Sequence, residues 1–148
     1  MTETPTAGSF DGREHRLPVR VYYEDTDFTG LVYHGSYVRF FERGRSDFLR
    51  AAGVGHAELM DGPSPLAFVV AEMSLRWLKP ARIDDALIVR TLYERIRGPR
   101  LIIDQRITRG DETLCEARVT AVCIHPDGRP RRPTTLLMEK VRPWLAPA

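Results

Sequence analysis

The hydrophobic side chains of this chain follow two different periods. Between Leu17 and Glu24 they alternate with polar side chains, which is typical of a half-buried strand. Between His34 and Ala52 they recur at helical spacing and gather within an arc of about 120°: Tyr37, Phe40, Phe41, Gly44, Phe48, Ala51 and Ala52. Gly53 then supplies the residue type that commonly ends a helix. The pattern predicts one strand followed by a long helix with an aromatic inner face.

Gly44 lies within that inner face. Glycine lowers helix propensity by about 1 kcal/mol relative to alanine, so its place there needs a reason. We expect another element of the fold to approach the helix closely at this position.

The chain after residue 66 has the pattern of four strands with short connections. Strand-like runs cover residues 67–77, 86–97, 100–109 and 113–125, and a short helix is expected over 136–141. Short links favour antiparallel neighbours. The five strands are therefore predicted to form one antiparallel sheet packed on the long helix, a two-layer α+β domain. Residues 1–15 lack periodicity and are expected to be a mobile tail, which leaves residues 16–148 as a single domain.

Composition and charge narrow the function classes. The chain has 22 basic and 20 acidic residues, and this balance does not favour a nucleic-acid partner. No apolar run approaches the roughly 20 residues that span a bilayer, and the N-terminus lacks the apolar core of a signal peptide. Cys115 and Cys123 fall in one predicted strand about 26 Å apart, too far for a disulfide. Two reduced thiols indicate a reducing compartment, so we expect a cytoplasmic protein without a membrane span.

The densest cluster of reactive side chains lies where the first strand leads into the helix, in YYEDTDFTGLVYHGSY. A helix N-terminus offers unpaired N–H groups and a positive dipole end that can polarise a carbonyl. Asp27, folded back by a turn at Gly30, could act beside it as base or nucleophile in acyl transfer. Simple helix capping also accounts for an acidic turn. A metal site of Asp25, Asp27 and His34 lacks a second histidine nearby, so we expect neither metal nor cofactor.

The run YYEDTDFTGLVYHGSYVRFFERGRSDFLRAAG resembles the signature of hotdog-fold acyl-CoA thioesterases. It is nearest to the bacterial branch associated with the Tol-Pal envelope system and more distantly similar to 4-hydroxybenzoyl-CoA thioesterases. The resemblance extends from about Leu17 through LKPARIDDAL to about Pro130. It implies a hotdog fold, with one long helix on a five-stranded antiparallel sheet. It also implies hydrolysis of an acyl-CoA to a free acid and coenzyme A, and a homodimer that often pairs into a tetramer.

The resemblance also implies roles by position. Asp27 aligns with the catalytic carboxylate of the family, and His34 aligns with the position whose backbone N–H receives the thioester carbonyl. Gly30 matches the turn that brings these two together. Tyr33 and Tyr37 match positions that line the acyl pocket or the subunit contact. The expected catalytic residues are therefore Asp27 and His34, and the expected substrate-binding residues are Gly30, Tyr33 and Tyr37.

Several other assignments stay open at this point. Asp25 and Glu24 are expected to be cap or surface carboxylates. Glu42 and Arg45 lie on neighbouring helix turns and could form an ion pair, although a helix carboxylate such as Glu42 is the active one in some other hotdog thioesterases. The basic residues near the C-terminus suit either a solvated segment or contacts with coenzyme A phosphates: Arg129, Arg131 and Arg132.

Two other functions compete with hydrolysis. A hotdog hydratase or dehydratase carries its catalytic Asp and His closer together with Asn-Pro between them, whereas Asp27 and His34 are seven residues apart with Phe-Thr-Gly between. A non-catalytic scaffold would bind acyl carrier protein or envelope partners through the same fold. The intact Asp27 and Gly30 weigh against that alternative.

Overall fold

The computed structural model of the protein describes residue 5 and residues 7–147. The part of the expected tail at residues 1–4 and 6 lies outside the described residues. The elements follow in this order: β1 (Ser9–Asp11), β2 (Glu14–Arg20), the 3-10 helix η1 (Tyr23–Asp25), α1 (His34–Ala51), α2 (His56–Asp61), β3 (Ala67–Trp77), β4 (Ala86–Arg97), β5 (Arg100–Arg109), β6 (Glu112–Ile124), α3 (Thr135–Val141) and the 3-10 helix η2 (Arg142–Trp144).

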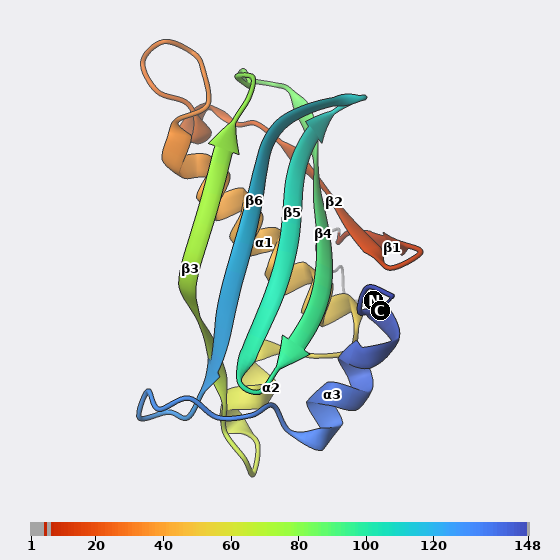
Figure 1. The fold of residues 1–148 in the computed structure, drawn as a ribbon. Helices are drawn as coiled ribbons and strands as arrows, with labels where there is room; N and C mark the ends of the chain where they lie inside the picture. Colours follow the sequence, from red (N-terminus) through yellow and green to blue (C-terminus); the bar gives the residue numbers. More distant parts are fainter. Residues whose placement is uncertain (1–4, 6, 148) are drawn as a thin grey trace.

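The strands form one antiparallel sheet in the order β1-β2-β4-β5-β6-β3. Helix α1 lies across one face of this sheet, and the opposite face has no helix over it (Figure 1). The predicted two-layer α+β architecture is confirmed, and β3, β4 and β5 have the predicted bounds. The sheet has six strands rather than the predicted five.

The inner face of α1 supplies much of the core. Its buried residues include Tyr37, Phe40, Phe41, Gly44 and Phe48, as the helical pattern predicts. Several positions differ from the prediction: Ala51 is exposed and Ala52 is half-buried, whereas Ser36, Arg45 and Leu49 are buried. The helix ends where expected, because Gly53 adopts a φ of 96° and its N–H bonds to the carbonyl of Arg50 at 3.0 Å.

Gly44 is a point at which α1 approaches the sheet closely. A Cβ atom built on this residue would lie 2.7 Å from Cγ1 of Val89, 2.9 Å from Oγ1 of Thr91 and 3.1 Å from Nε2 of Gln105. Real Cβ contacts are longer than this, so any larger residue would push α1 away from β4 and β5. The close approach inferred from the sequence is confirmed.

The expected tail is wrong from Ser9 onward, because residues 9–20 form the hairpin β1–β2. Phe10 anchors it by stacking on Trp144, with ring centroids 3.9 Å apart, and by packing edge-on against Phe48 at 5.0 Å. His15 is fully buried, and its Nε2 lies 3.0 Å from Oδ2 of Asp47. These partners come from α1 and the C-terminus, so local periodicity could not reveal them.

The first predicted strand is half right. β2 ends at Arg20, and the chain then turns into η1 instead of continuing to Glu24. Oδ2 of Asp25 accepts a hydrogen bond from the N–H of Tyr22 at 2.8 Å, which favours a turn over an extended strand. Tyr23 is consequently 82% exposed rather than inward-facing. The short helix α2 was also not predicted.

Both cysteines are free thiols in the core, as expected from their spacing. Burial raises the pKa of the Cys115 thiol to about 12. A thiol with such a pKa remains protonated at neutral pH and is a poor nucleophile, so Cys115 serves as a packing residue.

Replacing Gly44 by alanine should destabilise the protein. Alanine is the better helix former, but its Cβ would overpack the contact with Val89, at a cost of about 1–3 kcal/mol. Urea unfolding should therefore show a lower midpoint for Gly44→Ala. Arg39→Ala, at an exposed position of α1, is the control and should leave the midpoint nearly unchanged. A Gly44→Ala variant as stable as the wild type would contradict the close-approach argument.

Candidate active site

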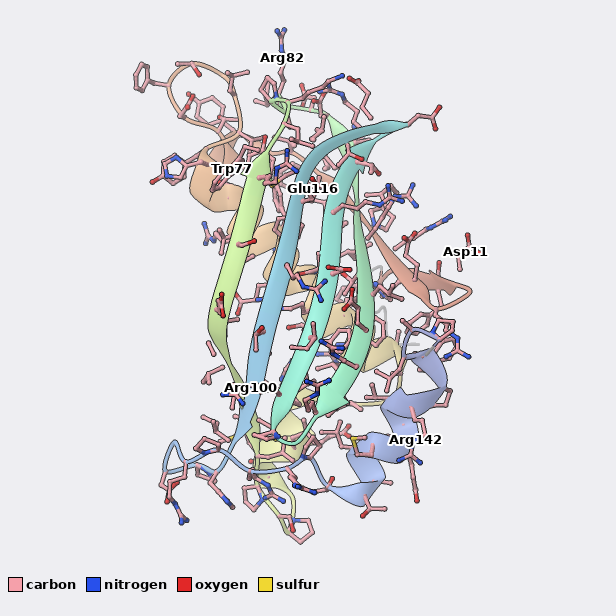
Figure 2. The ribbon with its side chains drawn as sticks, viewed as in Figure 1. Asp11, Trp77, Arg82, Arg100, Glu116 and Arg142 are labelled. Carbon is pink, nitrogen blue, oxygen red and sulfur yellow. The ribbon has the colours of Figure 1, made fainter. Side chains whose placement is uncertain are left out.

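A hollow of about 370 Å³ lies between the start of α1 and the end of β3. Trp77 is the last residue of β3 and lies beside the beginning of α1 (Figure 2). Its ring packs edge-on against that of His34, with centroids 6.2 Å apart. The residues around the hollow come from three segments: Asp27, Leu31, Val32, His34, Tyr37, Trp77, Leu78, Lys79 and Pro80. The hollow therefore lies at the place where the sequence concentrates its reactive side chains.

Hydrogen bonds join the two loops that form this hollow, the loop before α1 and the link between β3 and β4. The N–H of Val32, just before α1, donates to the carbonyl of Ala81 at 2.9 Å, and Leu31 forms a β-bridge with Arg82. The N–H of Ala81 in turn donates to the hydroxyl of Tyr37 at 3.0 Å. Because Ala81 is fully buried, both of its backbone groups depend on these bonds. The link between β3 and β4 is thus held against the loop that carries Asp27.

Asp27 opens a tight turn that ends at Gly30. The carbonyl of Asp27 accepts from the N–H of Gly30 at 3.3 Å, and the N–H of Asp27 donates to the carbonyl of Leu31 at 2.9 Å. Gly30 has a φ of 85°, in the left-handed region that glycine enters without steric cost. The turn predicted from the sequence is therefore present at Gly30, and it folds Asp27 back toward the helix start.

The two oxygens of the Asp27 carboxylate have different surroundings. Oδ1 accepts hydrogen bonds from the hydroxyl of Thr29 at 2.5 Å and from its N–H at 2.8 Å. These bonds stabilise the ionised form and hold the pKa of Asp27 below its usual value. Within the described part of the chain, Oδ2 accepts no hydrogen bond. One oxygen fixes the carboxylate, and the other is available to a water molecule or a substrate.

Helix α1 begins without a capping side chain. The N–H of Tyr33 donates to the carbonyl of Asp25, and the N–H of Ser36 donates to the carbonyl of Tyr33, both at 2.9 Å. Among residues 7–147, no group accepts from the N–H of His34 or Gly35. These two amides at the positive end of the helix dipole can bind a carbonyl oxygen that gains negative charge.

The remaining predicted side chains differ in how they relate to the hollow. Tyr37 lines it but is buried, and its hydroxyl is engaged by Ala81. His34 also lines it, with an exposed imidazole. Tyr33 is half exposed and packs on the His34 ring at 4.3 Å without lining the hollow. The structure therefore brings Asp27, His34 and Tyr37 together around the hollow and leaves Tyr33 outside it.

The sequence profile of the thioesterase superfamily matches residues 29–116, more than half of the chain. The protein belongs to this superfamily. Among its relatives, the acyl-CoA thioester hydrolase YbgC of Escherichia coli is 46% identical over 112 residues, which cover 75% of this chain and 82% of that protein. The expected family is thus confirmed, while the association with the Tol-Pal system stays a prediction.

Solved structures of thioesterases share the fold. A probable thioesterase from Bartonella henselae superimposes with a TM-score of 0.79 at 41% identity, covering 82% of this chain and 99% of its own. A Thermus thermophilus thioesterase that was crystallised with coenzyme A and zinc has a TM-score of 0.78 at 22% identity, covering 94% of this chain and all of its own. The predicted hotdog fold is confirmed.

Other predicted carboxylates of this thioesterase lie away from the hollow. Asp25 caps η1 through the bond from Tyr22, as expected, and Glu24 is exposed. The predicted ion pair between Glu42 and Arg45 is wrong, because the Arg45 guanidinium turns into the core and donates to Oε1 of Gln105 at 3.0 Å. Glu42 lines a separate cavity further along α1 and not the hollow beside Asp27.

The basic residues near the C-terminus lie far from the hollow within one chain. They follow β6, whose last residue Ile124 pairs with Ala67 at the start of β3, whereas the hollow adjoins Trp77 at the other end of β3. Arg129 pairs with Asp127 at 2.8 Å, and Arg131 donates to the carbonyl of Pro65. Any contact with coenzyme A phosphates would therefore have to occur at the site of another chain.

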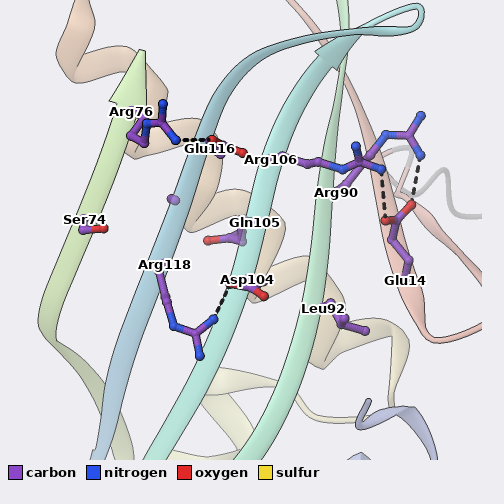
Figure 3. A pocket seen from close by; sticks show the side chains of 11 residues that line it. Glu14, Ser74, Arg76, Arg90, Leu92, Asp104, Gln105, Arg106, Glu116 and Arg118 are labelled. Atoms are coloured by element: carbon purple, nitrogen blue, oxygen red, sulfur yellow. Dashed lines mark hydrogen bonds and ion pairs between the residues drawn. The ribbon is translucent and has the colours of Figure 1, made fainter. Parts of the chain in front are cut away.

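A different hollow, of about 430 Å³, lies on the sheet face opposite α1 (Figure 3). Three of its four arginines are matched by carboxylates at close range: Arg76 with Glu116 at 3.3 Å, Arg118 with Asp104 at 2.7 Å and Arg90 with Glu14 at 2.9 Å. The fourth, Arg106, lies 4.0 Å from the same Glu14. Exposed pairs of this kind contribute little stability each but neutralise the surface. This hollow therefore offers no concentrated charge for an acyl thioester.

Several residues around the candidate site carried no recognisable signal in the sequence. Thr29 fixes the carboxylate through its hydroxyl, and Trp77, Leu78 and Lys79 form a wall from a distant part of the sequence. Of these residues, only Thr29 could have been suspected from the sequence. It lies two residues after Asp27, and short polar side chains commonly form local hydrogen bonds in turns.

Two kinds of feature are absent from the residues that the structure describes. No group of three or more His, Cys, Asp or Glu side chains is placed to hold a metal ion. None of the helices combines the length and the apolar character needed to cross a bilayer.

Thr29→Val should raise the pKa of Asp27 toward its ordinary value. The substitution removes the hydroxyl that stabilises the carboxylate, whereas the bond from the Thr29 backbone remains, so the shift is partial. An NMR titration of the Asp27 carboxyl carbon measures it. Thr26→Val, which removes a hydroxyl bonded to the carbonyl of Tyr23, is the control. An unchanged Asp27 pKa in Thr29→Val would show that the hydroxyl does not stabilise the carboxylate.

Proposed function

We propose that the protein hydrolyses an acyl-CoA thioester to a free acid and coenzyme A at the hollow beside α1. The observation that carries this proposal is the meeting of two groups in one place: a carboxylate with a free oxygen and a helix end with two open amides. Thioester hydrolysis requires both, one to supply or activate the nucleophile and one to stabilise the oxyanion. The names of the relatives agree with this substrate class.

In the proposed reaction the thioester carbonyl oxygen accepts from the N–H of His34, with the N–H of Gly35 beside it. The free oxygen of Asp27 either removes a proton from water as the water attacks the carbonyl carbon, or attacks that carbon directly. In both routes the C–S bond breaks and coenzyme A leaves as a thiolate that takes up a proton. In the second route, water then hydrolyses a mixed anhydride and regenerates the carboxylate.

The charge state of Asp27 suits either route. An aspartate is ionised at neutral pH, and the lowered pKa of Asp27 extends its ionised state to more acidic solution. The same shift predicts that activity persists on the acid side until Asp27 becomes protonated, below the pH at which an ordinary aspartate would lose its charge. An oxyanion donor typically contributes about 10²–10³ in rate, and a positioned base about 10²–10⁴.

We also propose that the protein is a homo-oligomer, a dimer or a tetramer, whose first contact is strand β3. This strand has 11 residues, lies at the edge of the sheet and exposes nearly half of Val69, Val70 and Trp77. Long apolar edge strands are templates for pairing with another chain. Antiparallel pairing of two β3 strands would place the basic C-terminal segment of each chain near the hollow of the other, where coenzyme A phosphates could meet it.

Two further expectations are independent of this proposal. Acyl carrier protein as a partner and a cytoplasmic location both follow from the sequence and stay predictions.

Asp27→Asn should lower kcat/KM for acyl-CoA hydrolysis by at least about 10²-fold, because it removes the base or nucleophile while preserving shape. Release of free thiol across a panel of acyl-CoAs measures the effect. Glu24→Gln, at an exposed carboxylate three residues away, is the matched control and should retain activity. Near-normal turnover by Asp27→Asn would remove Asp27 from the proposed role, and hydration of crotonyl-CoA would favour the hydratase alternative.

Val70→Glu should weaken the proposed oligomer, because two copies would bring like charges together along paired β3 edges. Light scattering after size exclusion should give a multiple of the 16.9 kDa chain for the wild type and a smaller mass for the variant. Leu136→Glu, at an exposed apolar residue of α3, is the control. A monomeric wild type, or a Val70→Glu variant of unchanged mass, would contradict the β3 interface.

A further inference from the structure

A second cavity, of about 140 Å³, lies between α1, α2 and the β3 side of the sheet. Apolar side chains form part of its wall, among them Leu49, Phe68 and Ile103. Polar side chains that the proposed reaction does not use also line it: Glu42, Arg45, Ser46, His56 and Tyr93. The cavity is distinct from the hollow beside Asp27, because the two share no residue.

Arg45 is a buried cation without a directly paired anion among the described residues. Its residue surface is only 9% exposed, and its side chain makes one hydrogen bond, to the neutral amide oxygen of Gln105. The amide nitrogen of Gln105 is occupied by Thr91 and by the carbonyl of Phe41. No carboxylate within the described part of the chain forms an ion pair with Arg45. Burying an unpaired charge is costly, so a partner of opposite charge would be strongly favoured here.

His56 contributes a second unsatisfied group to the same cavity. Its Nε2 is buried and has no hydrogen-bond partner among the described residues, while its ring packs edge-on against Phe68 with centroids 5.8 Å apart. Burial lowers the pKa of His56, so the imidazole is neutral at pH 7 and can donate one hydrogen bond. Ser46 adds a hydroxyl from α1.

The surroundings hold Arg45 in place and define the kind of anion that fits. The Tyr93 hydroxyl donates to the carbonyl of Arg45 at 3.2 Å, which ties this turn of α1 to β4. Glu42 also borders the cavity and is exposed; it forms no ion pair with Arg45, but its carboxylate attracts the guanidinium at longer range. The wall is about equally polar and apolar, which suits a carbon chain that ends in a polar head group.

We propose that this cavity binds the carboxylate end of an aliphatic acid. The guanidinium of Arg45 would hold the carboxylate, since its planar fork matches carboxylate geometry, and His56 and Ser46 would donate to it. The walls formed by Leu49 and Phe68 would contact the adjoining methylene groups. A water molecule takes up about 30 Å³ of liquid, so the cavity accommodates the carboxylate and a few carbons rather than a whole long-chain acid.

Such a carboxylate has two sources. It could belong to a free fatty acid, or to the far end of a dicarboxylic acyl group whose thioester lies at His34. Arg45 is eleven residues beyond His34 on α1, about 16 Å along the helix axis, so only a long acyl group would reach both places. The second source rests on the proposed thioesterase function, whereas the first does not.

Binding of free acid is tested by titrating the purified protein with sodium octanoate and with octanamide, its uncharged analogue. Octanoate should raise the thermal unfolding midpoint and give a calorimetric isotherm, and octanamide should do neither. Arg45→Met should weaken octanoate binding about tenfold or more, because it removes a charged donor and keeps the stem. Arg43→Met, at an exposed arginine of the same helix, is the matched control and should bind like the wild type.

The dicarboxylic source is tested by comparing hydrolysis of dodecanedioyl- and hexadecanedioyl-CoA with that of dodecanoyl- and hexadecanoyl-CoA. If the far carboxylate reaches Arg45, Arg45→Met should raise KM for the diacid thioesters about tenfold and leave the monoacid thioesters unchanged. A response in either assay supports the carboxylate site and identifies its source. The proposal is overturned if octanoate binds no better than octanamide and Arg45→Met does not discriminate between diacid and monoacid thioesters. Failure of the thioesterase function itself would show as no hydrolysis of any acyl-CoA, and the octanoate titration would still decide.

Arg45→Met also removes the donor to Gln105, so a second variant separates binding from folding. Ser46→Leu fills the cavity from α1 and leaves the bond between Arg45 and Gln105 in place. It should abolish the octanoate effect while unfolding like the wild type without ligand. Octanoate binding that persists in a folded Ser46→Leu protein would place the ligand elsewhere and overturn the proposal.

Discussion

The uncapped start of α1 is the constraint on which the rest of the site depends. Backbone N–H groups at a helix N-terminus need partners. The part of the chain that the structure describes satisfies those of Tyr33 and Ser36 but leaves those of His34 and Gly35 open. The surrounding loops keep this end accessible, because Ala81 is fixed by Val32 on one side and by Tyr37 on the other. The hollow is thus an outcome of backbone hydrogen bonding as much as of side-chain shape.

The same helix serves two different purposes along its length. Its first turn faces the hollow beside Asp27, and its middle is pressed against the sheet at Gly44. Next to Gly44, Arg45 and Gln105 form a polar network inside an otherwise apolar core. Networks of this kind are costly to bury, which is why the cavity beside Arg45 invites a functional explanation rather than one based on stability.

Much of the fold follows from the sequence because its signals are local. The periods of residues 34–51 and of the strands from residue 67 onward identify α1, β3, β4, β5 and β6 nearly to the residue. The hairpin β1–β2 could not be predicted in the same way, since Phe10 is held by Trp144 from the far end of the chain. The first strand was extended too far because the side chain of Asp25 stabilises a turn that alternation alone does not reveal.

The residues of the candidate site also differ in whether local sequence signals could identify them. Asp27, Gly30 and His34 lie in one short segment, so a motif could identify them and the turn that brings them together. Trp77 and Lys79 reach the hollow through tertiary contact, and no spacing in the sequence connects them to Asp27. Helical spacing left an ion pair with Glu42 open for Arg45, because it cannot show that the guanidinium turns toward Gln105. A structure with a non-hydrolysable acyl-CoA ketone analogue, in which a methylene group replaces the thioester sulfur, tests the central claim most directly. The ketone oxygen should lie within hydrogen-bond distance of the His34 N–H, with the Asp27 carboxylate beside the carbonyl carbon. An acyl carbonyl bound away from this helix end, or separated from Asp27, would contradict the account.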